Sequence, residues 1–230
     1  KYNLFLINDN CHAVGAKIKG NSNYAVKYAD IVTQSFHPVK HITTGEGGAI
    51  MTNNKKIYKK IKILRNHGIE RNQIDLKNKG MWFYKMSELG YNYRISDINC
   101  ALGASQLKSV RKFIHKRRTI AEYYNHLLKN TENIFTPIEK KGFYHSYHLY
   151  PLRIDFSKVN LSKKEFFKKM LNLGISLQVH YIPIYKQNYY KKKYSFKEQN
   201  FQESENFYNQ EVSLPIYFDL SKRDVYNVCQ

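Results

Sequence analysis

Three polar residues near the start of the sequence have types and a spacing that could perform covalent chemistry. Asp9 follows an apolar run over residues 3–8, and a carboxylate at the carboxyl end of a buried strand lies where α/β sheets bind ligands. Ser35 ends a second apolar run, and Lys40 follows it five residues later. A buried lysine has a lowered pKa and becomes a nucleophile that forms an imine with a carbonyl compound. This set therefore predicts carbonyl chemistry at the edge of a sheet.

Each of these residues also has a plainer structural explanation, and the residues alone leave both open. An aspartate after a strand often caps the next turn, and a lysine on a loop is usually solvated. The glycines of segment 45–48 are a weak candidate for a phosphate-binding loop, because the next element is expected to be a strand and not a helix. Segment 90–94 has a glycine and two tyrosines, which fit a turn with a packed aromatic ring as well as a site.

The elements that must position these residues alternate between strands and helices in the first half of the chain. Apolar stripes at helical spacing predict a helix over residues 53–66, and Gly68 marks its end. Ser96 is a good helix start for a long helix, or a kinked pair, that continues to Leu127 and links two domains. We expect strands over residues 3–8, 30–36 and 48–52, and an irregular polar segment over 69–89.

The second half of the chain predicts a smaller α/β domain. Ser162 and Glu165 form a capping box at the start of a helix, and Gly174 follows its last apolar residue. We expect strands over 148–156 and 175–181, a basic aromatic loop over 185–199, and helices over 201–211 and 221–230. The chain is therefore expected to be an α/β protein of two domains, residues 1–115 and residues 116–230.

The composition narrows the function classes. Lys and Arg number 38 against 18 Asp and Glu, which gives a net charge of +20. These cations are spread over several expected helix faces and do not gather in one tail, so solvated lysine faces are a better explanation than nucleic-acid binding. A positive potential would also speed the approach of a substrate that bears a diphosphate.

The cysteines and the apolar runs indicate the compartment. The three cysteines are widely spaced and form no CxxC pair, which argues against a disulfide framework and against a structural zinc site. The apolar runs are too short to span a bilayer, and no signal peptide is apparent. We therefore expect a protein of the reducing cytoplasm that has no metal site and no membrane partner. The sequence begins with a lysine followed closely by a strand-like run, which suggests a piece of a longer protein.

Taken together, the chemistry-bearing segments resemble the DegT/DnrJ/EryC1/StrS family of sugar aminotransferases. The matching segments are Asp9-x-x-His12-Ala13-x-Gly15, Ser35-Phe36-His37-x-x-Lys40, Thr44-x-Glu46-Gly47-Gly48-Ala49, Arg65-x-His67-Gly68, Gly90-Tyr91-Asn92-Tyr93-Arg94, Ala101-Leu102-Gly103-x-x-Gln106-Leu107 and His180-Tyr181-x-Pro183-x-Tyr185. The resemblance covers nearly the whole chain. It implies a fold-type-I transferase dependent on pyridoxal 5'-phosphate, with residues 1–115 forming the C-terminal part of its large α/β/α domain and 116–230 a smaller α/β domain.

The resemblance also implies roles for residues of the first domain. Lys40 would be the catalytic residue, carrying the cofactor as an imine and later moving protons. Asp9 would pair with the pyridine nitrogen and keep it protonated, His12 would contact the ring hydroxyl, and Ser35 would bind the phosphate. Asn92 would reach the phosphate of the neighbouring subunit's cofactor in a homodimer.

Within the family, three stretches are most similar to the branch that acts in pseudaminic acid biosynthesis. They are Ser35–Lys40, His148–Pro151 and Gln178–Tyr181. This similarity implies transfer of an amino group from L-glutamate to C4 of a UDP-linked 4-keto-6-deoxy-N-acetylhexosamine. His180, Tyr181 and Tyr185 would then bind the nucleotide sugar.

Three alternatives stay open at this point. The first is an aminotransferase of the same family that acts on another nucleotide-linked keto sugar. The second is a pyridoxal-dependent sugar dehydratase, whose lysine position holds histidine; Lys40 stands in the aminotransferase register and His41 falls one place later, which disfavours it. The third is a basic nucleic-acid-binding module, which offers no reason for Asp9, Ser35 and Lys40 to occur together.

Two departures from the family pattern bear on activity. Asn8 stands where a second acid is common, which should matter little if Asp9 is the pyridine partner. The family's upstream phosphate-binding turn and the aromatic that stacks on the cofactor ring are not in this sequence. We therefore expect residues 1–230 alone to bind the cofactor poorly and to be inactive.

Overall fold

The computed structural model describes residues 2–230 and divides the chain into two units, Lys1–Val110 and Arg111–Gln230. We call them unit 1 and unit 2. The division falls at the start of helix α5 (Val110–Leu128), and the boundary predicted after residue 115 lies within that helix. The assignment of the two units to a large and a small enzyme domain stays a prediction.

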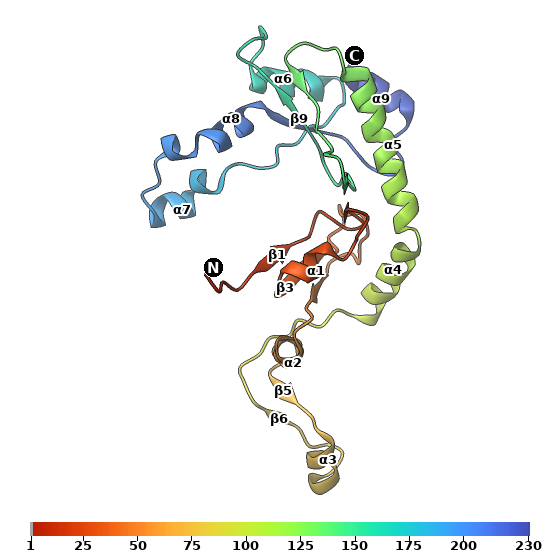
Figure 1. The fold of residues 1–230 in the computed structure, drawn as a ribbon, viewed down its shortest axis with the longest axis vertical. Helices are drawn as coiled ribbons and strands as arrows, with labels where there is room; N and C mark the ends of the chain where they lie inside the picture. The colour runs from red at the N-terminus through yellow and green to blue at the C-terminus, as the bar shows by residue number, and fades with distance from the viewer. Residues whose placement is uncertain (1) are drawn as a thin grey trace. The chain divides into compact units, whose positions relative to one another are not determined.

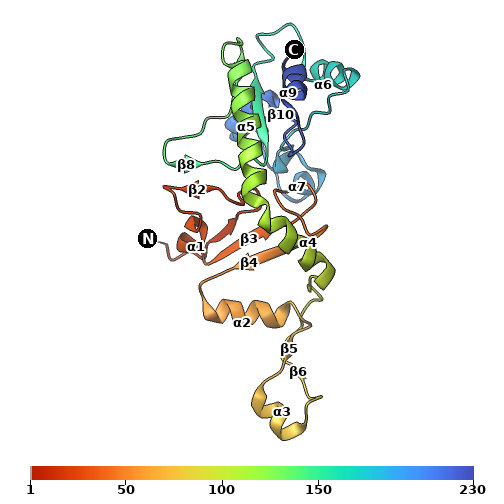
Figure 2. The same cartoon turned by 90° about the vertical axis from the view of Figure 1, so that its right-hand side faces the viewer.

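Unit 1 is built on a three-stranded sheet in the order β1-β3-β4. Strand β1 (Ile7–Asp9) runs parallel to β3 (Ile31–Ser35), and β4 (Gly48–Met51) runs antiparallel to β3, as Figure 2 shows for β3 and β4. The carboxyl ends of β1 and β3 therefore meet at one edge of the sheet, and the loop of residues 36–47 leaves from that edge. This topology brings the predicted site segments to the same place.

Strand β1 differs from its prediction as a buried strand over residues 3–8. Regular pairing begins at Ile7, and the Ile7 side chain is 59% exposed while that of Leu4 is 79% exposed. Within the described residues, β3 is the strand that pairs with β1, so β1 is an outer strand. An apolar run becomes buried only when another element covers it. On the edge of β1 that does not face β3, no described strand of the sheet pairs with it.

Side-chain caps begin the two longer helices of unit 1, and the cap at Ser96 was predicted from the sequence. Asn54 accepts hydrogen bonds from the backbone of Lys56 and Ile57 at the start of α2 (Lys55–Leu64). Ser96 accepts one from the Asn99 backbone at the start of α4 (Asp97–Lys108). Ser109 separates α4 from α5, so the segment predicted as one long helix or a kinked pair forms two helices. Two short elements precede β3, namely β2 (Lys17–Ile18) and α1 (Tyr24–Tyr28).

The segment predicted to be irregular, residues 69–89, has more order than expected. It forms the antiparallel pair of β5 (Ile69–Glu70) and β6 (Lys85–Met86) with helix α3 (Gln73–Lys79) between them. The three elements make an arm that points away from the sheet of unit 1 (Figures 1 and 2). Polar contacts hold it, including an ion pair of 3.6 Å between Lys85 Nζ and Glu70 Oε2. Elements held by polar contacts show no periodic pattern of apolar residues in the sequence, and for that reason the sequence does not predict these two strands and this helix.

Unit 2 packs helices against an antiparallel sheet in the order β10-β9-β7. Strand β9 (Tyr150–Ile154) is central, between β10 (Glu211–Leu214) and β7 (Ile134–Phe135). A contiguous core forms from buried side chains of three helices, of the sheet and of the loops that connect them. Its members are Ile120, Ala121, Tyr124, Leu128, Tyr147, Tyr150, Leu152, Ile154, Met170, Leu177, Val212, Leu214, Leu220 and Val225. The remaining elements are β8 (Phe143–Tyr144), α6 (Lys163–Asn172), η1 (Ile184–Lys186), α7 (Asn188–Lys193), η2 (Glu198–Phe201), α8 (Gln202–Gln210) and α9 (Lys222–Cys229).

Some predictions for unit 2 are confirmed and others are wrong. The capping box of Ser162 and Glu165 is present at α6, and α8 matches the helix predicted over 201–211. The strand predicted over 175–181 is reduced to an isolated bridge between Gln178 and Ser213. The loop predicted over 185–199 contains α7 and two short 3₁₀ turns, and β10 was not predicted because only two of its four residues are apolar.

Arg117 is a buried cation that joins three parts of unit 2. Its Nη1 donates to the carbonyls of Tyr147, His148 and Ile216 at 3.2, 3.1 and 2.8 Å. Burial lowers the pKa of the guanidinium to about 10. Carbonyl dipoles therefore solvate this charge in place of water.

No helix in the described part of the chain has the length and apolarity to cross a membrane.

Candidate active site

The carboxyl edge of β1 and β3 brings together the residues predicted to do chemistry. Asp9 lies opposite Thr33 in the parallel register, and Ser35 lies two residues further along β3. Because side chains alternate along a strand, Asp9, Thr33 and Ser35 are on the same face of the sheet. Lys40 lies on the loop that follows β3, near enough to Asp9 for the charges of the two side chains to interact.

Asp9 is held as an anion by its neighbours. The Asp9 Oδ1 accepts a hydrogen bond of 3.0 Å from the Cys11 backbone, which is the local turn contact that the plainer explanation foresaw. Hydrogen bonds from the side chain and backbone of Cys11 hold the pKa of the Asp9 carboxyl below its ordinary value, and the charges of His12 and Lys40 act in the same direction. The turn contact and a role toward a cationic ligand are compatible, because a carboxylate has more than one acceptor position.

Lys40 is half-buried on an internally bonded loop. Its backbone donates to the His37 carbonyl at 3.0 Å, and the Phe36 backbone donates to the Gly47 carbonyl at 2.9 Å. Burial lowers the pKa of the Lys40 ammonium, while the negative charge of Asp9 and the charge that the Cys11 thiol acquires at high pH oppose that change. A lowered pKa increases the fraction of neutral amine, which is the form that attacks a carbonyl carbon.

The loop closes tightly onto the sheet. The Thr43 Oγ donates to the Phe36 carbonyl at 3.1 Å, and the Thr44 Oγ donates to the Glu46 carbonyl at 2.7 Å. A Cβ atom at Gly48 would lie 2.6 Å from the Gln34 carbonyl oxygen, so the first residue of β4 must be glycine for this pairing.

His12 and Ser35 complete the group around Asp9. His12 is half-buried, and its charge contributes to the low pKa of Asp9. The Ser35 Oγ accepts a hydrogen bond of 3.3 Å from the His37 backbone. The structure thus gathers four of the predicted residues, Asp9, His12, Ser35 and Lys40, at one edge of unit 1.

Asn92 lies on a different part of unit 1, where two of the motif segments meet. The His67 backbone donates to the Tyr91 carbonyl at 2.8 Å, and the Arg94 Nη1 donates to the His67 Nε2 at 2.7 Å. Gly68 has a φ of +70°, and a Cβ there would lie 1.7 Å from the Glu88 carbonyl oxygen. Residues 91–94 are exposed, and Asn92 is among them.

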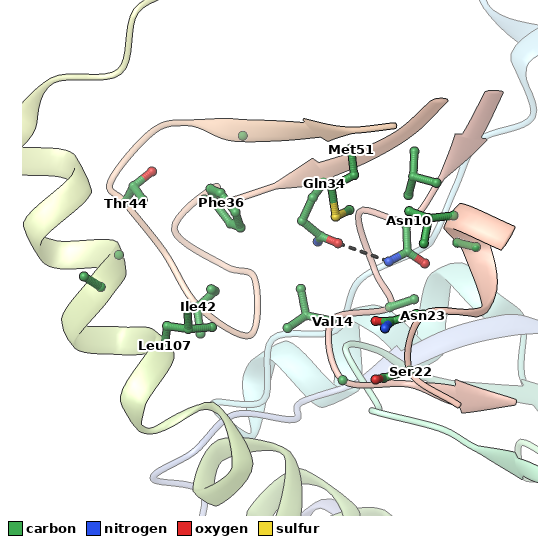
Figure 3. Close-up of a pocket in the computed structure, with 18 of the residues that line it drawn as sticks. Asn10, Val14, Ser22, Asn23, Gln34, Phe36, Ile42, Thr44, Met51 and Leu107 are labelled. Carbon is green, nitrogen blue, oxygen red and sulfur yellow. Dashed lines mark hydrogen bonds between the residues drawn. The ribbon is translucent and has the colours of Figure 1, made fainter. Parts of the chain in front are cut away.

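A separate apolar pocket of about 640 Å³ lies on the other face of the sheet in unit 1 (Figure 3). Its walls include Val14, Ile42 and Leu107, and none of Asp9, Ser35 and Lys40 lines it. The polar pair in this pocket is Asn10 and Gln34, joined by a hydrogen bond of 3.2 Å from Asn10 Nδ2 to Gln34 Oε1. The pocket is therefore distinct from the candidate active site.

The predicted sugar-binding residues lie in unit 2 and differ in exposure. Tyr181 is exposed and follows the half-buried His180, whose Nδ1 lies 2.7 Å from the Ser213 Oγ. Tyr185 is buried; it stacks on Phe201 with ring centroids 4.3 Å apart and donates to Glu205 Oε1 at 2.7 Å. Their roles stay predictions.

Cys11 is a member of the site that the sequence reasoning missed. Its thiol lies 3.9 Å from the Thr33 Oγ, and burial raises the thiol pKa. The signal was available, because an aspartate often bonds the backbone two residues later and so brings that residue's side chain close.

The fold and this site define a class of protein that comparison identifies. The model of the DegT/DnrJ/EryC1/StrS aminotransferase family matches residues 1–230, and the chain belongs to this family. A UDP-4-amino-4,6-dideoxy-N-acetyl-beta-L-altrosamine transaminase from Campylobacter jejuni is 41% identical over 225 residues, which are 97% of this chain and 56% of that protein. The uncharacterized protein MJ1066 of Methanocaldococcus jannaschii is 38% identical over 228 residues, 99% of this chain and 58% of that protein.

Solved structures agree with the family. The chain superposes on Helicobacter pylori PseC, an aminotransferase involved in the biosynthesis of pseudoaminic acid, with a TM-score of 0.86, at 31% identity over 98% of this chain and 58% of that one. Spr1654 from Streptococcus pneumoniae in its PMP-form gives a TM-score of 0.88 at 27% identity, covering 98% of this chain and 57% of that one. The predicted family and the fold-type-I class are confirmed. The chain spans somewhat more than half the length of the relatives it matches.

Proposed function

We propose that this chain belongs to a pyridoxal 5'-phosphate-dependent aminotransferase that acts on a nucleotide-linked keto sugar. The observation that carries the proposal is the placement of Asp9, at the carboxyl end of β1, and of the half-buried Lys40, on the loop that follows β3, at one edge of the sheet. A binding module would have no need for a lysine of lowered pKa beside an anionic aspartate. The confirmed family and the PLP-form of the Spr1654 structure support the choice of cofactor.

The residues present fit that cofactor. A pyridinium nitrogen needs an anionic partner, and Asp9 has a lowered pKa that keeps it ionised. A carbonyl group that binds covalently needs a neutral amine, and burial moves the Lys40 ammonium toward that form. When bound, the cofactor supplies a ring that withdraws electrons from the carbon that carries the amino group.

The five predicted residues of unit 1 then have separate roles. Lys40 Nζ would hold the cofactor covalently and, when the amine is free again, would move a proton to and from C4 of the sugar. Asp9 keeps the proton on the ring nitrogen, His12 orients the ring through its hydroxyl, and Ser35 binds the phosphate. Asn92, exposed on its own unit, binds the cofactor phosphate of a second copy in a homodimer.

The substrate we propose is a UDP-linked 4-keto-6-deoxy-N-acetylhexosamine, with L-glutamate as the amino donor. The identities of 41% and 42% to the two Campylobacter jejuni transaminases support this choice. We propose further that the reaction belongs to pseudaminic acid biosynthesis and takes place in the cytoplasm. His180, Tyr181 and Tyr185 bind the nucleotide sugar. The net charge of +20 favours an anionic diphosphate substrate.

The test uses the native protein that contains residues 1–230, expressed with any segments that flank them. The protein is mixed with pyridoxal 5'-phosphate, reduced with borohydride and digested, and the modified peptide is mapped by mass spectrometry. We expect the cofactor on Lys40 and, with L-glutamate, conversion of the UDP-linked 4-keto sugar to its 4-amino product. Modification of other lysines with Lys40 untouched would overturn the cofactor assignment. A Lys40 adduct together with turnover of a different keto sugar would overturn the substrate assignment alone.

A further inference from the structure

The segment around Asn92 in unit 1 is tied on both sides to one neighbouring stretch of backbone, residues 64–67. The Tyr91 N–H donates to the Leu64 carbonyl at 2.7 Å, and the Tyr93 N–H donates to the carbonyl of the residue after Leu64 at 2.9 Å. Asn92 itself forms an isolated antiparallel bridge with the same stretch. Main-chain hydrogen bonds therefore fix the residues on either side of Asn92.

Arg94 closes this crossing with its side chain. Its Nη1 lies 2.9 Å from the Asn66 Oδ1 and 2.7 Å from the His67 Nε2. A guanidinium has donors and no acceptor, so both contacts run from Arg94 to its neighbours. The chain turns sharply at this point, because His67 has a φ of +59° and Gly68 has one of +70°. Arg94 thus binds the turn from which the stretch 64–67 leaves the crossing.

Direct contact between main chains supports the crossing before Asn92. A Cβ atom at Gly90 would lie 2.1 Å from the Gly68 nitrogen, so only glycine permits this approach. The segment is therefore anchored by its main chain before Asn92 and by the side chain of Arg94 after it. A polar group that must meet a ligand at one place needs support of this kind.

The tyrosines beside Asn92 indicate the side on which its amide lies. The rings of Tyr91 and Tyr93 stack with their centroids 4.8 Å apart and 11° between their planes. Side chains alternate along an extended segment, so two rings that stack at positions i and i+2 leave the residue between them on the opposite side. Asn92 is also exposed in unit 1, and its amide can therefore meet a ligand that approaches from that side.

We propose that Arg94 is a positioning residue: by binding Asn66 and His67 it holds the segment that presents Asn92, so that the Asn92 amide donates to the cofactor phosphate of a second copy. The inference rests on the proposed function, because it takes Asn92 to bind that phosphate. It adds that Arg94 acts through Asn92 and not as a direct cationic partner of the phosphate, because its Nη1 is already engaged within the chain.

The first test separates the phosphate contact from the rest of the cofactor. The flanked native protein is freed of cofactor, and its affinities for pyridoxal 5'-phosphate and for pyridoxal, which has no phosphate, are measured by equilibrium dialysis. We expect Arg94→Ala to weaken binding of the phosphorylated probe by roughly three- to tenfold, the effect of about one hydrogen bond, and to leave that of pyridoxal unchanged. Arg71→Ala, which removes an exposed arginine of the arm, is the matched control and should change neither affinity. Equal losses for both probes, or no loss for either, would overturn the proposal.

The second test asks whether Arg94 acts through Asn92. Asn92→Ala should weaken binding of pyridoxal 5'-phosphate by roughly tenfold or more. Arg94→Ala added to it should cause at most about a twofold further loss, because the group that Arg94 positions is then gone. Additive losses would show that Arg94 meets the phosphate itself and would overturn the proposal. A lower molecular mass of Arg94→Ala in light scattering would also overturn it, because the arginine would then act on assembly.

Borohydride trapping distinguishes failure of this inference from failure of the proposed function. A wild-type adduct at Lys40, together with normal cofactor affinity in both Asn92→Ala and Arg94→Ala, overturns the inference and leaves the covalent role of Lys40 intact. The absence of a wild-type adduct at Lys40 overturns the proposed function and this inference with it.

Discussion

Unit 1 and unit 2 divide the work of this chain differently. Unit 2 buries a contiguous core, in which Tyr124, Tyr150 and Val212 have no exposed surface. Unit 1 carries the candidate cofactor residues, yet its outer strand β1 leaves Ile7 largely exposed. Burial of apolar side chains therefore stabilises mainly unit 2, whereas the residues proposed for covalent chemistry lie in unit 1.

The difference teaches how the candidate site depends on its surroundings. The residues around Lys40 are ordered by short backbone and threonine hydrogen bonds within one loop, and each such bond contributes only about 1 kcal/mol. The ring of His180 contacts the hydroxyl of Ser213, which donates to the fully buried carboxylate of Glu211, and both residues belong to strand β10 of unit 2. Changes at the Lys40 loop should thus affect chemistry more than stability, and changes in the core of unit 2 should do the opposite.

The largest expected effect is the loss of chemistry without loss of fold. Lys40→Ala in the flanked native protein should abolish covalent binding of the cofactor and reduce transamination to background, because no other group supplies the amine. Borohydride trapping and a product assay measure this. Lys56→Ala, an exposed lysine on α2, is the matched control and should retain both. Normal turnover by Lys40→Ala would contradict the assignment of the covalent chemistry to unit 1.

A pair of leucines tests the other half of the comparison. Leu152 is 3% exposed in the core of unit 2, and Leu4 is 79% exposed beside β1. Leu152→Ala should lower the free energy of unfolding by about 2–5 kcal/mol, since it opens a cavity. Leu4→Ala should change it by less than about 0.5 kcal/mol. Urea unfolding followed by circular dichroism measures both, and equal losses would contradict the assignment of packing energy to unit 2.

Replacing the carboxylate of Asp9 should affect rate more than binding. Asp9→Asn removes the negative charge that keeps the cofactor ring nitrogen protonated, and we expect transamination to slow by roughly two orders of magnitude, or about 3 kcal/mol of barrier. The amide can still accept the Cys11 backbone hydrogen bond, so the turn should persist. Steady-state kinetics with saturating cofactor measure the change. Unchanged turnover would mean that Asp9 serves the turn alone.

The smallest expected effect is a pH-dependent contribution of one ion pair to the stability of unit 2. The Arg118 guanidinium, which donates to Glu139 at 2.6 Å, lowers the pKa of that carboxyl from its ordinary value of 4.5. The stability from this pair is therefore present above that ordinary value and is lost as pH falls through the lowered pKa. Glu139→Gln should cost at most about 1 kcal/mol at neutral pH, and its deficit in melting temperature should shrink at acid pH. A deficit that is constant down to the acid transition would count against the ion pair.

Much of the candidate site could be predicted because its residues follow local rules. A strand end, an Asp-x-Cys turn and a lysine five residues after Ser35 are visible in the sequence, and the parallel pairing of β1 with β3 brings them together. Helix starts at Ser96 and Ser162 were equally readable, because capping depends on neighbours in the chain.

What could not be predicted depends on contacts between distant residues. The partners Ser213 and Glu211 lie more than thirty positions after His180, and β10 has too short an apolar pattern to mark it as a strand. The exposure of β1 was missed for a similar reason, because burial of an apolar run depends on elements that its own residues do not reveal.

The arm of β5, α3 and β6 provides the chain with a built-in optical probe. Trp82 is the single tryptophan of the sequence, it is 78% exposed, and its ring lies so close to Gly80 that a Cβ there would come within 2.5 Å of it. Emission excited in the indole band therefore originates in this arm, while the 20 tyrosines absorb at shorter wavelengths. A blue shift on concentrating the protein would reveal that another copy covers the arm, with no label attached.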